Sequence, residues 1–254
     1  MFIMAFITPP SSLSGAPATS SALNLALNVA PSFHKLTSEI FFAPISSVAI
    51  NPETPEWLRT VVWTDFRLAV AFFVISPLFL LGWSALECRP GKKNELSADA
   101  ILRIMTGYWQ ASSLLLITVL LNMEASPIGV VTGAVAQFMI FVSLNWWTSL
   151  TMEAEEDGST IQSQIFGSWR TITSWVAGFG VATQVPFLPC VVATNLVDDP
   201  YCAAWLEPPR MAAMLLGIAE DANLNELATA GLTIYIAYLV YYLTVILPSI
   251  GRKG

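Results

Sequence analysis

The three cysteines are the residues whose chemistry this sequence predicts most directly. Cys190 and Cys202 fall in one predicted loop, whereas Cys88 lies alone in a basic loop. Disulfides persist in oxidising compartments, while the cytosol keeps thiols reduced. We expect a structural Cys190–Cys202 disulfide in an outer loop and a free Cys88 thiol inside; two unpaired cysteines are the alternative. A catalytic redox pair is disfavoured because the chain lacks C-x-x-C spacing.

Other reactive chemistry has little support in the sequence. The single histidine, His34, lies in the N-terminal region without a predicted catalytic partner. Neither a G-x-S-x-G motif nor a phosphate-binding glycine loop occurs. The acidic residues 153–157 lack the alternating spacing of a calcium-binding EF-hand loop, so we interpret them as a solvated loop. We therefore expect no catalytic residue, no metal site and no obligatory cofactor.

Uncharged polar side chains inside apolar segments leave two interpretations open. They are Gln110, Asn122, Gln137, Asn145 and Gln184. Such groups could ligate a chlorophyll magnesium or hydrogen-bond a quinone, but interhelical hydrogen bonds of about 0.6 kcal/mol each are the simpler interpretation. A tyrosine stripe at 235, 238 and 242 is similarly either a stacking surface for a pigment or ordinary helix packing.

Asp65 and Arg67 are charged residues at the start of the first apolar segment. We expect both at its outer rim, each with a different neighbour, because residues two apart do not share a helix face. Five windows of the chain contain no charged residue and no histidine: 68–86, 104–123, 125–152, 171–197 and 227–251. Buried ionisable groups usually mark ion or proton pathways, so this pattern argues against proton-coupled transport.

The composition indicates an integral membrane protein. Of 254 residues, 55% are hydrophobic and 11% are charged, and the mean hydropathy is +0.62. Soluble domains average about 25% charged residues. The net charge of −7 leaves no basic surface for nucleic acid, so the expected partner is the lipid bilayer.

Five segments are long and apolar enough to span that bilayer. A helix rises about 1.5 Å per residue, so about 20 residues cross a hydrocarbon core of about 30 Å. The predicted spans are about 65–87, 104–123, 128–150, 165–185 and 227–248. Thr64 is the predicted N-cap of the first span. Pro77 should kink that span, and neighbouring helices must then satisfy the carbonyl that it frees.

Small residues predict where helices approach each other closely. Gly129 and Gly133 repeat at four-residue spacing in the third span, and Gly178 belongs to a second small-residue face in the fourth. We therefore expect an all-α bundle of about five transmembrane helices, with these three glycines at helix contacts.

The chain divides into an extension and a membrane domain. Residues 1–56, rich in small residues and proline, are predicted to be poorly ordered, and 57–254 form the transmembrane domain. An outer loop, 186–226, is stapled by the disulfide and contains a short helix from Met211 to Leu227. Seven of the eleven Lys and Arg residues fall on one side, which places the N-terminus outside and the C-terminus in the cytoplasm.

Five short motifs lie along this domain. They are Trp63–Val70, Ser168–Arg170, Pro186–Cys190, Pro200–Cys202 and Trp205–Pro209. Together they resemble an uncharacterised family of cyanobacterial polytopic membrane proteins over about residues 57–250. The resemblance implies a cyanobacterial plasma or thylakoid membrane and no assigned activity, so it carries over no catalytic residue.

These observations favour a non-catalytic integral membrane protein. We expect an accessory, assembly or scaffold factor of a larger membrane complex, such as a photosynthetic one, with other integral membrane subunits as partners. The alternatives are a transporter or channel for a neutral small molecule, or a protein that binds chlorophyll or quinone.

Overall fold

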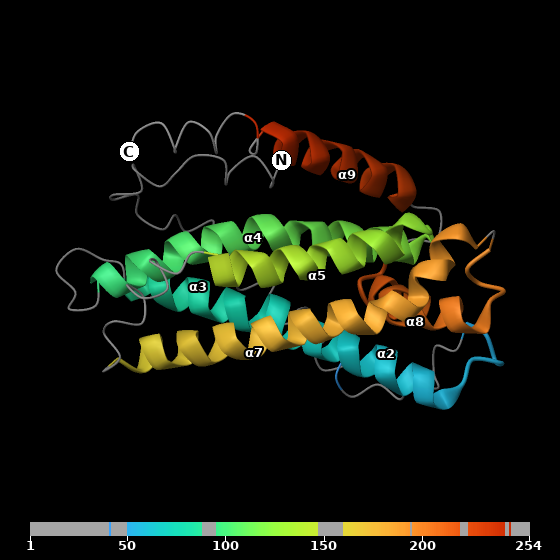
Figure 1. The fold of residues 1–254 in the computed structure, drawn as a ribbon, viewed down its shortest axis with the longest axis horizontal. Helices are drawn as coiled ribbons and strands as arrows, with labels where there is room; N and C mark the ends of the chain where they lie inside the picture. The colour runs from blue at the N-terminus through green and yellow to red at the C-terminus, as the bar shows by residue number, and fades with distance from the viewer. Residues whose placement is uncertain are drawn as a thin grey trace. The chain divides into compact units, whose positions relative to one another are not determined.

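The computed structural model describes residues 41, 50–87, 95–146, 160–193, 195–218, 223–241 and 244. Most of the predicted extension, Cys88 and the acidic segment 153–157 lie outside these residues. The chain divides into two units, Met1–Pro44 and Ile45–Gly254. All the elements below belong to the second unit, and each of them is helical (Figure 1).

The first long helix consists of three parts that follow one another directly in the sequence. These are α2 (Glu56–Ala69), the π-helix η3 (Val70–Ile75) and α3 (Ser76–Glu87). The helix begins nine residues before the predicted start at 65, because Pro55 is its N-cap and Glu56 supplies a favourable negative charge in the first turn. Thr64 is therefore not the N-cap: its hydroxyl donates to the Thr60 carbonyl within the helix, at 2.6 Å.

Three further helices follow the predicted spans. They are α4 (Glu95–Met123), α5 (Ile128–Trp146) and α7 (Ile161–Gln184). A tight turn joins α4 to α5, with Ala125 at φ 54° and the Ser126 N–H donating to the Leu121 carbonyl at 2.9 Å. The side chain of Thr160 caps α7 by accepting from the Ser163 N–H.

Within the described residues, four helices are long and apolar enough to cross a membrane. They are the continuous α2–η3–α3 helix, α4, α5, and α7 with the 3-10 helix that follows it. The fifth predicted span corresponds to α9 (Leu224–Tyr241), which is not among these four. It packs on α4 through Ala228 against Ile117 and Leu121, and the Tyr235 hydroxyl donates to Met139 Sδ of α5 at 3.3 Å.

The predicted outer loop contains more helix than expected. It holds the 3-10 helix η4 (Val185–Val192) and α8 (Pro200–Leu215). The expected short helix from 211 to 227 is therefore wrong at both ends. Asp199 starts α8 by accepting from the N–H groups of Tyr201 and Cys202 at 2.8 and 3.2 Å, and Gly217, at φ 64°, follows its end.

Two apolar clusters position the elements. The larger one fills the space between η3, α3, α4, α5 and α7, around Phe73, Tyr108 and Ile140. The second surrounds the two loop cysteines and joins α2 to η4 and α8, through residues such as Leu58 and Leu206. In Figure 1, α4 and α5 run side by side, with α7 packed on α5 and α9 on α4.

Candidate functional site

The break at Pro77 is the first functional feature, because it changes the backbone in the middle of a long helix. Proline has no N–H, so carbonyls one turn earlier lose their donor. In the preceding π-helix the hydrogen-bond step is five residues, as in the Ser76 N–H that bonds to the Ala71 carbonyl. Pro77 therefore cannot donate to either carbonyl one turn earlier, that of Phe72 or that of Phe73.

Two aromatic side chains from other helices replace the missing donor. The Tyr108 hydroxyl of α4 donates to the Phe73 carbonyl at 2.7 Å, and the Trp169 Nε1–H of α7 donates to the Phe72 carbonyl at 3.0 Å. The two rings contact each other edge to face, 5.3 Å apart. As predicted, neighbouring helices satisfy the carbonyls that the proline frees.

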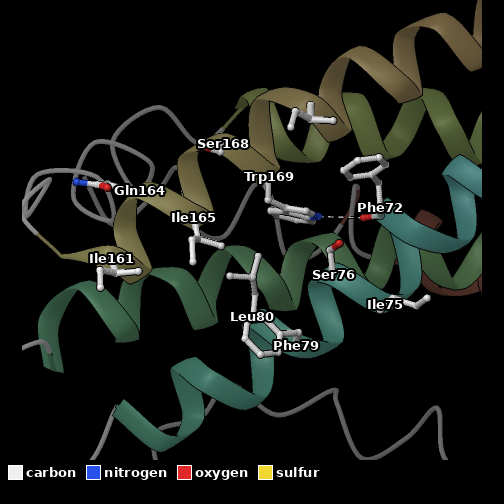
Figure 2. A pocket seen from close by; sticks show the side chains of 11 residues that line it. Phe72, Ile75, Ser76, Phe79, Leu80, Ile161, Gln164, Ile165, Ser168 and Trp169 are labelled. Carbon is white, nitrogen blue, oxygen red and sulfur yellow. Dashed lines mark hydrogen bonds between the residues drawn. The ribbon is translucent and has the colours of Figure 1, made fainter. Parts of the chain in front are cut away.

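A groove of about 620 Å³ opens beside this break. Figure 2 shows Trp169 reaching from α7 to Phe72, with Ser76, Phe79 and Ile165 around the opening. The groove is lined mainly by apolar side chains from η3 and α3 on one side and from α7 on the other. It can accept an apolar chain or ring.

A second groove, of about 590 Å³, lies on the other side of α7, against α5. Phe141 and Asn145 of α5 line it, together with Arg170, Trp175 and Phe179 of α7. Trp175 and Phe179 are well exposed, at 76% and 66%. The α7 face between the two grooves is therefore open along much of its length.

Where α5 meets α7, each helix places a glycine opposite a glutamine of the other helix. Gly133 of α5 faces Gln184 of α7, whose Oε1 would lie 3.3 Å from a Cβ at that glycine. One turn further along α5, Gln137 lies against Gly180, where a Cβ would overlap the amide. Each helix thus provides a glycine that makes room for the buried glutamine of the other.

The same layer holds a carboxylate. Asp65 of α2 forms a side-chain hydrogen bond with Gln137, which is only 2% exposed. Gln137 is midway along α5, so Asp65 is level with the middle of a helix rather than with its end. Asp65 precedes the charge-free segment 68–86, and its predicted position at the outer rim of a membrane stays a prediction.

A tightly connected cap closes the end of the bundle where α2 begins. The predicted Cys190–Cys202 disulfide is present and joins η4 to α8. Nearby, the fully buried Glu207 forms a 3.0 Å ion pair with Arg59 and accepts from the Trp63 Nε1–H at 3.3 Å. The Ile50 N–H donates to the same carboxylate at 3.3 Å. The cap is therefore fixed to α2 by charge as well as by sulfur.

The predicted packing glycines have different surroundings. Gly129 lies against Asn122, and Gly133 contacts Gln184 and Thr118. Gly178 is exposed and lines the second groove, where the nearest side chain to its Cβ position is Phe141 at 3.9 Å. The close contact on α7 is made by Gly180 instead.

Arg67 contacts an aromatic ring of its own helix. Its guanidinium carbon lies 5.7 Å from the centre of the Trp63 ring. Among the polar side chains in the helices, Asn145 forms an interhelical bond: its Nδ2 donates to Ser174 Oγ at 3.1 Å. A position at the outer rim of a membrane stays a prediction for Arg67.

Sequence reasoning missed Glu207, Tyr108 and Trp169. Glu207 is a single acid within an apolar motif and is followed by two prolines, and that isolation was its only signal. Tyr108 and Trp169 could have been sought as donors for the carbonyls that Pro77 frees. Nothing in the sequence indicated which aromatic residue would reach them.

The sequence model of a family described as "Protein of unknown function (DUF3177)" matches residues 59–254. No curated protein and no solved structure matches the chain. The matched segment includes α2 from Arg59 onward and every later helix. This agrees with the resemblance to an uncharacterised family, whereas a cyanobacterial origin stays a prediction.

Proposed function

Because the chain belongs to this family of unknown function, we propose from its own contacts that it is a non-catalytic integral membrane protein. It acts as an accessory, assembly or scaffold factor of a larger membrane complex, and its partners are other integral membrane subunits. The observation that carries this proposal is the open face of α7, which has a groove on each side.

That face suits a partner helix. A helix in lipid binds another by close packing, and grooves beside small residues allow the two backbones to approach. On α7 the exposed Gly178 lies at the floor of one groove, between the projecting rings of Trp175 and Phe179. A partner side chain can enter at the glycine while its helix packs between the rings.

The rest of the molecule supports a rigid platform. The disulfide and the buried Glu207–Arg59 pair fix α8 to the start of α2, and Tyr108 with Trp169 fixes the Pro77 break. A rigid surface loses little conformational freedom on binding, which favours association.

The proposed membrane arrangement has five spans, counting α9 together with the residues that follow it. The N-terminus is outside and the C-terminus is cytoplasmic. The membrane is the plasma or thylakoid membrane of a cyanobacterium. An outer position for η4 and α8 is supported by their disulfide, since such compartments are oxidising.

Photo-crosslinking in native membranes tests the proposal. A photoreactive phenylalanine analogue at Trp175 is expected to give a discrete crosslinked product with another membrane protein. The same analogue at Leu116, an exposed position on α4, serves as the control. Lipid adducts alone at both positions, together with purification as a lone chain, would contradict a scaffold function.

A matched pair of glycine variants locates the surface. Gly178→Leu fills the second groove, so we expect the crosslink at Trp175 to disappear and co-purifying subunits to be lost. Gly82→Leu places the same side chain on α3, where no atom lies within 4 Å of the Cβ position. That variant should keep both.

Binding of a pigment or quinone is a second candidate, favoured by the groove in Figure 2. Its volume of about 620 Å³ lies in the range of ligand sites, about 300–1,000 Å³. The absorbance spectrum of protein purified from its native membrane, with extraction of bound lipophiles, tests it. A colourless protein without a stoichiometric quinone would exclude both ligands.

A further inference from the structure

Three buried amide oxygens along α5 have no hydrogen-bond donor among the described residues. They are Asn122 Oδ1, Gln184 Oε1 and Gln137 Oε1. Buried acceptors are normally satisfied, so each unsatisfied one calls for a water molecule or an ion. Together with Asp65, Thr118 and Thr132 we call these residues the polar row.

The members of the polar row are regularly spaced. Asn122 lies at Gly129, Gln184 lies at Gly133, and Gln137 occupies the next position at the same interval. Positions four residues apart on a helix are separated by about 6 Å along its axis. Between the first two, Thr118 Oγ1 donates to Thr132 Oγ1 at 3.0 Å. The row therefore descends turn by turn from the α4–α5 turn into the bundle.

The polar row ends at a carboxylate. Gln137 is ten residues beyond Pro127, or about 15 Å along α5, which is half the thickness of a hydrocarbon core. There its side chain bonds to Asp65. Beyond this level the buried residues of α5 are the apolar Ile140 and Leu144. The row thus begins at the α4–α5 turn, beside the apolar cluster that joins α2 to η4 and α8, and ends at the apolar core.

The polar row offers hydrogen-bond acceptors that have no matching donors in the described part of the chain. Its unsatisfied atoms are all acceptors, and its one formal charge is the Asp65 carboxylate. Carboxylate, amide and hydroxyl oxygens are the ligands of hard cations. A single carboxylate balances a single positive charge, and a buried charge needs such a partner.

We propose that the polar row binds one monovalent alkali cation next to Asp65. Gln137 positions Asp65 through its hydrogen bond, and its remaining oxygen faces the cation. Gln184 and the two threonines provide further oxygen atoms along the row. The site binds rather than conducts, because the apolar core closes its inner end.

Cation-dependent thermal stability of the intact, detergent-purified protein tests this proposal. Unfolding is followed by tryptophan fluorescence in NaCl, KCl or N-methylglucamine chloride at equal ionic strength. We expect a saturable rise of the melting temperature with Na⁺ or K⁺ only, because a ligand that binds only the folded state stabilises it. Equal melting temperatures in all three salts would overturn the proposal.

Two variants place the site. Asp65→Asn keeps the shape and removes the charge, so the alkali-dependent shift should be lost. Asp99→Asn makes the same change at a partly exposed carboxylate that pairs with Arg103 at 2.6 Å, and it should keep the shift. A full shift in Asp65→Asn would show that the cation binds elsewhere, and this too would overturn the proposal.

A third variant covers the case in which Asp65→Asn does not fold. Gln184→Met keeps a side chain of similar length but removes the amide oxygen. We expect it to raise the cation concentration at half-saturation about tenfold, which corresponds to about 1.4 kcal/mol. Titration of Na⁺ into the wild type by calorimetry gives the reference affinity; no measurable heat together with an unchanged half-saturation in Gln184→Met would overturn the site.

Discussion

Pro77 shows how one residue places demands on two other helices. It cannot donate to the carbonyls one turn earlier, and Tyr108 of α4 and Trp169 of α7 donate to two of them. Both side chains are buried, so water does not replace them. At the scale of single residues, the stability of the first helix therefore depends on hydrogen bonds made by its neighbours.

The Tyr108 hydroxyl can be tested alone. Tyr108→Phe keeps the ring and leaves the Phe73 carbonyl unsatisfied, so we expect a loss of about 1–3 kcal/mol in the free energy of unfolding. Tyr235→Phe is the control, because that hydroxyl donates to the sulfur of Met139, a weak acceptor. Denaturant titration in detergent measures both, and equal losses would contradict the special role of Tyr108.

Glu207 is the second residue with an effect beyond its size. Removing one partner of a buried ion pair leaves an uncompensated charge, so Glu207→Gln should cost about 3 kcal/mol of unfolding free energy. The double variant Arg59→Met with Glu207→Met should recover part of this loss, because the Trp63 and Ile50 N–H groups still lose their acceptor. If the loss in the double variant equals the sum of the losses in Arg59→Met and Glu207→Met alone, the two side chains are not coupled.

An exposed pair provides the comparison for Glu207. Asp99 and Arg103 form a bridge one turn apart on α4, with side chains 37% and 58% exposed. Such surface pairs contribute about 0–1 kcal/mol. Asp99→Asn should therefore leave the free energy of unfolding nearly unchanged.

At the scale of helices, the glycine–glutamine exchange determines how closely α5 and α7 approach. A methyl group at Gly180 would overlap the Gln137 amide, whereas the nearest atom to a Cβ at Gly178 is 3.9 Å away. Two glycines on one helix therefore have opposite tolerance for alanine.

This difference gives a direct prediction. Gly180→Ala should lower the free energy of unfolding by about 1–3 kcal/mol through overpacking, while Gly178→Ala should be close to neutral. Thermal unfolding of the two variants in the same detergent measures the difference. A larger loss in Gly178→Ala would mean that the exposed face of α7 is already packed in the purified protein.

The helices themselves were largely predictable because long apolar segments have few alternatives. The start of the first helix was not, since Pro55 and Glu56 favour helix in a stretch that hydropathy alone leaves out. The helix α8 was misplaced because consecutive prolines usually end a helix. Here Pro208 and Pro209 are buried inside it, and the Asp199 cap fixes its beginning.

At the scale of the molecule, the threading through the membrane makes one prediction about accessibility. In oriented membrane vesicles, Cys88 should react with an impermeant thiol reagent only from the cytoplasmic side. With Cys88→Ser as background, Ser126→Cys in the α4–α5 turn should react only from the opposite side. Cys190 and Cys202 should react only after reduction. Labelling of positions 88 and 126 from the same side would contradict the proposed orientation.

The candidate sites were less predictable than the fold. Gln137, Gln184 and Asn122 were recognised as polar residues in apolar segments, but their alignment depends on which helices pair and in what register. The disulfide followed from two cysteines in one loop. The contact between Asp65 and Gln137 did not follow, because the register that brings them together is set by the whole core.

The hydrogen bonds at Pro77 also bear on the order in which the chain matures. Tyr108 and Trp169 come later in the chain than Phe72 and Phe73, so a newly made first helix lacks the side-chain donors that these two carbonyls have in the folded protein. These hydrogen bonds form only when α4 and α7 have been synthesised and have packed against the first helix. The first long helix to be synthesised therefore completes its hydrogen bonds only after the later helices have formed. A stalled or truncated chain would expose the Phe72 and Phe73 carbonyls to the cell's quality control.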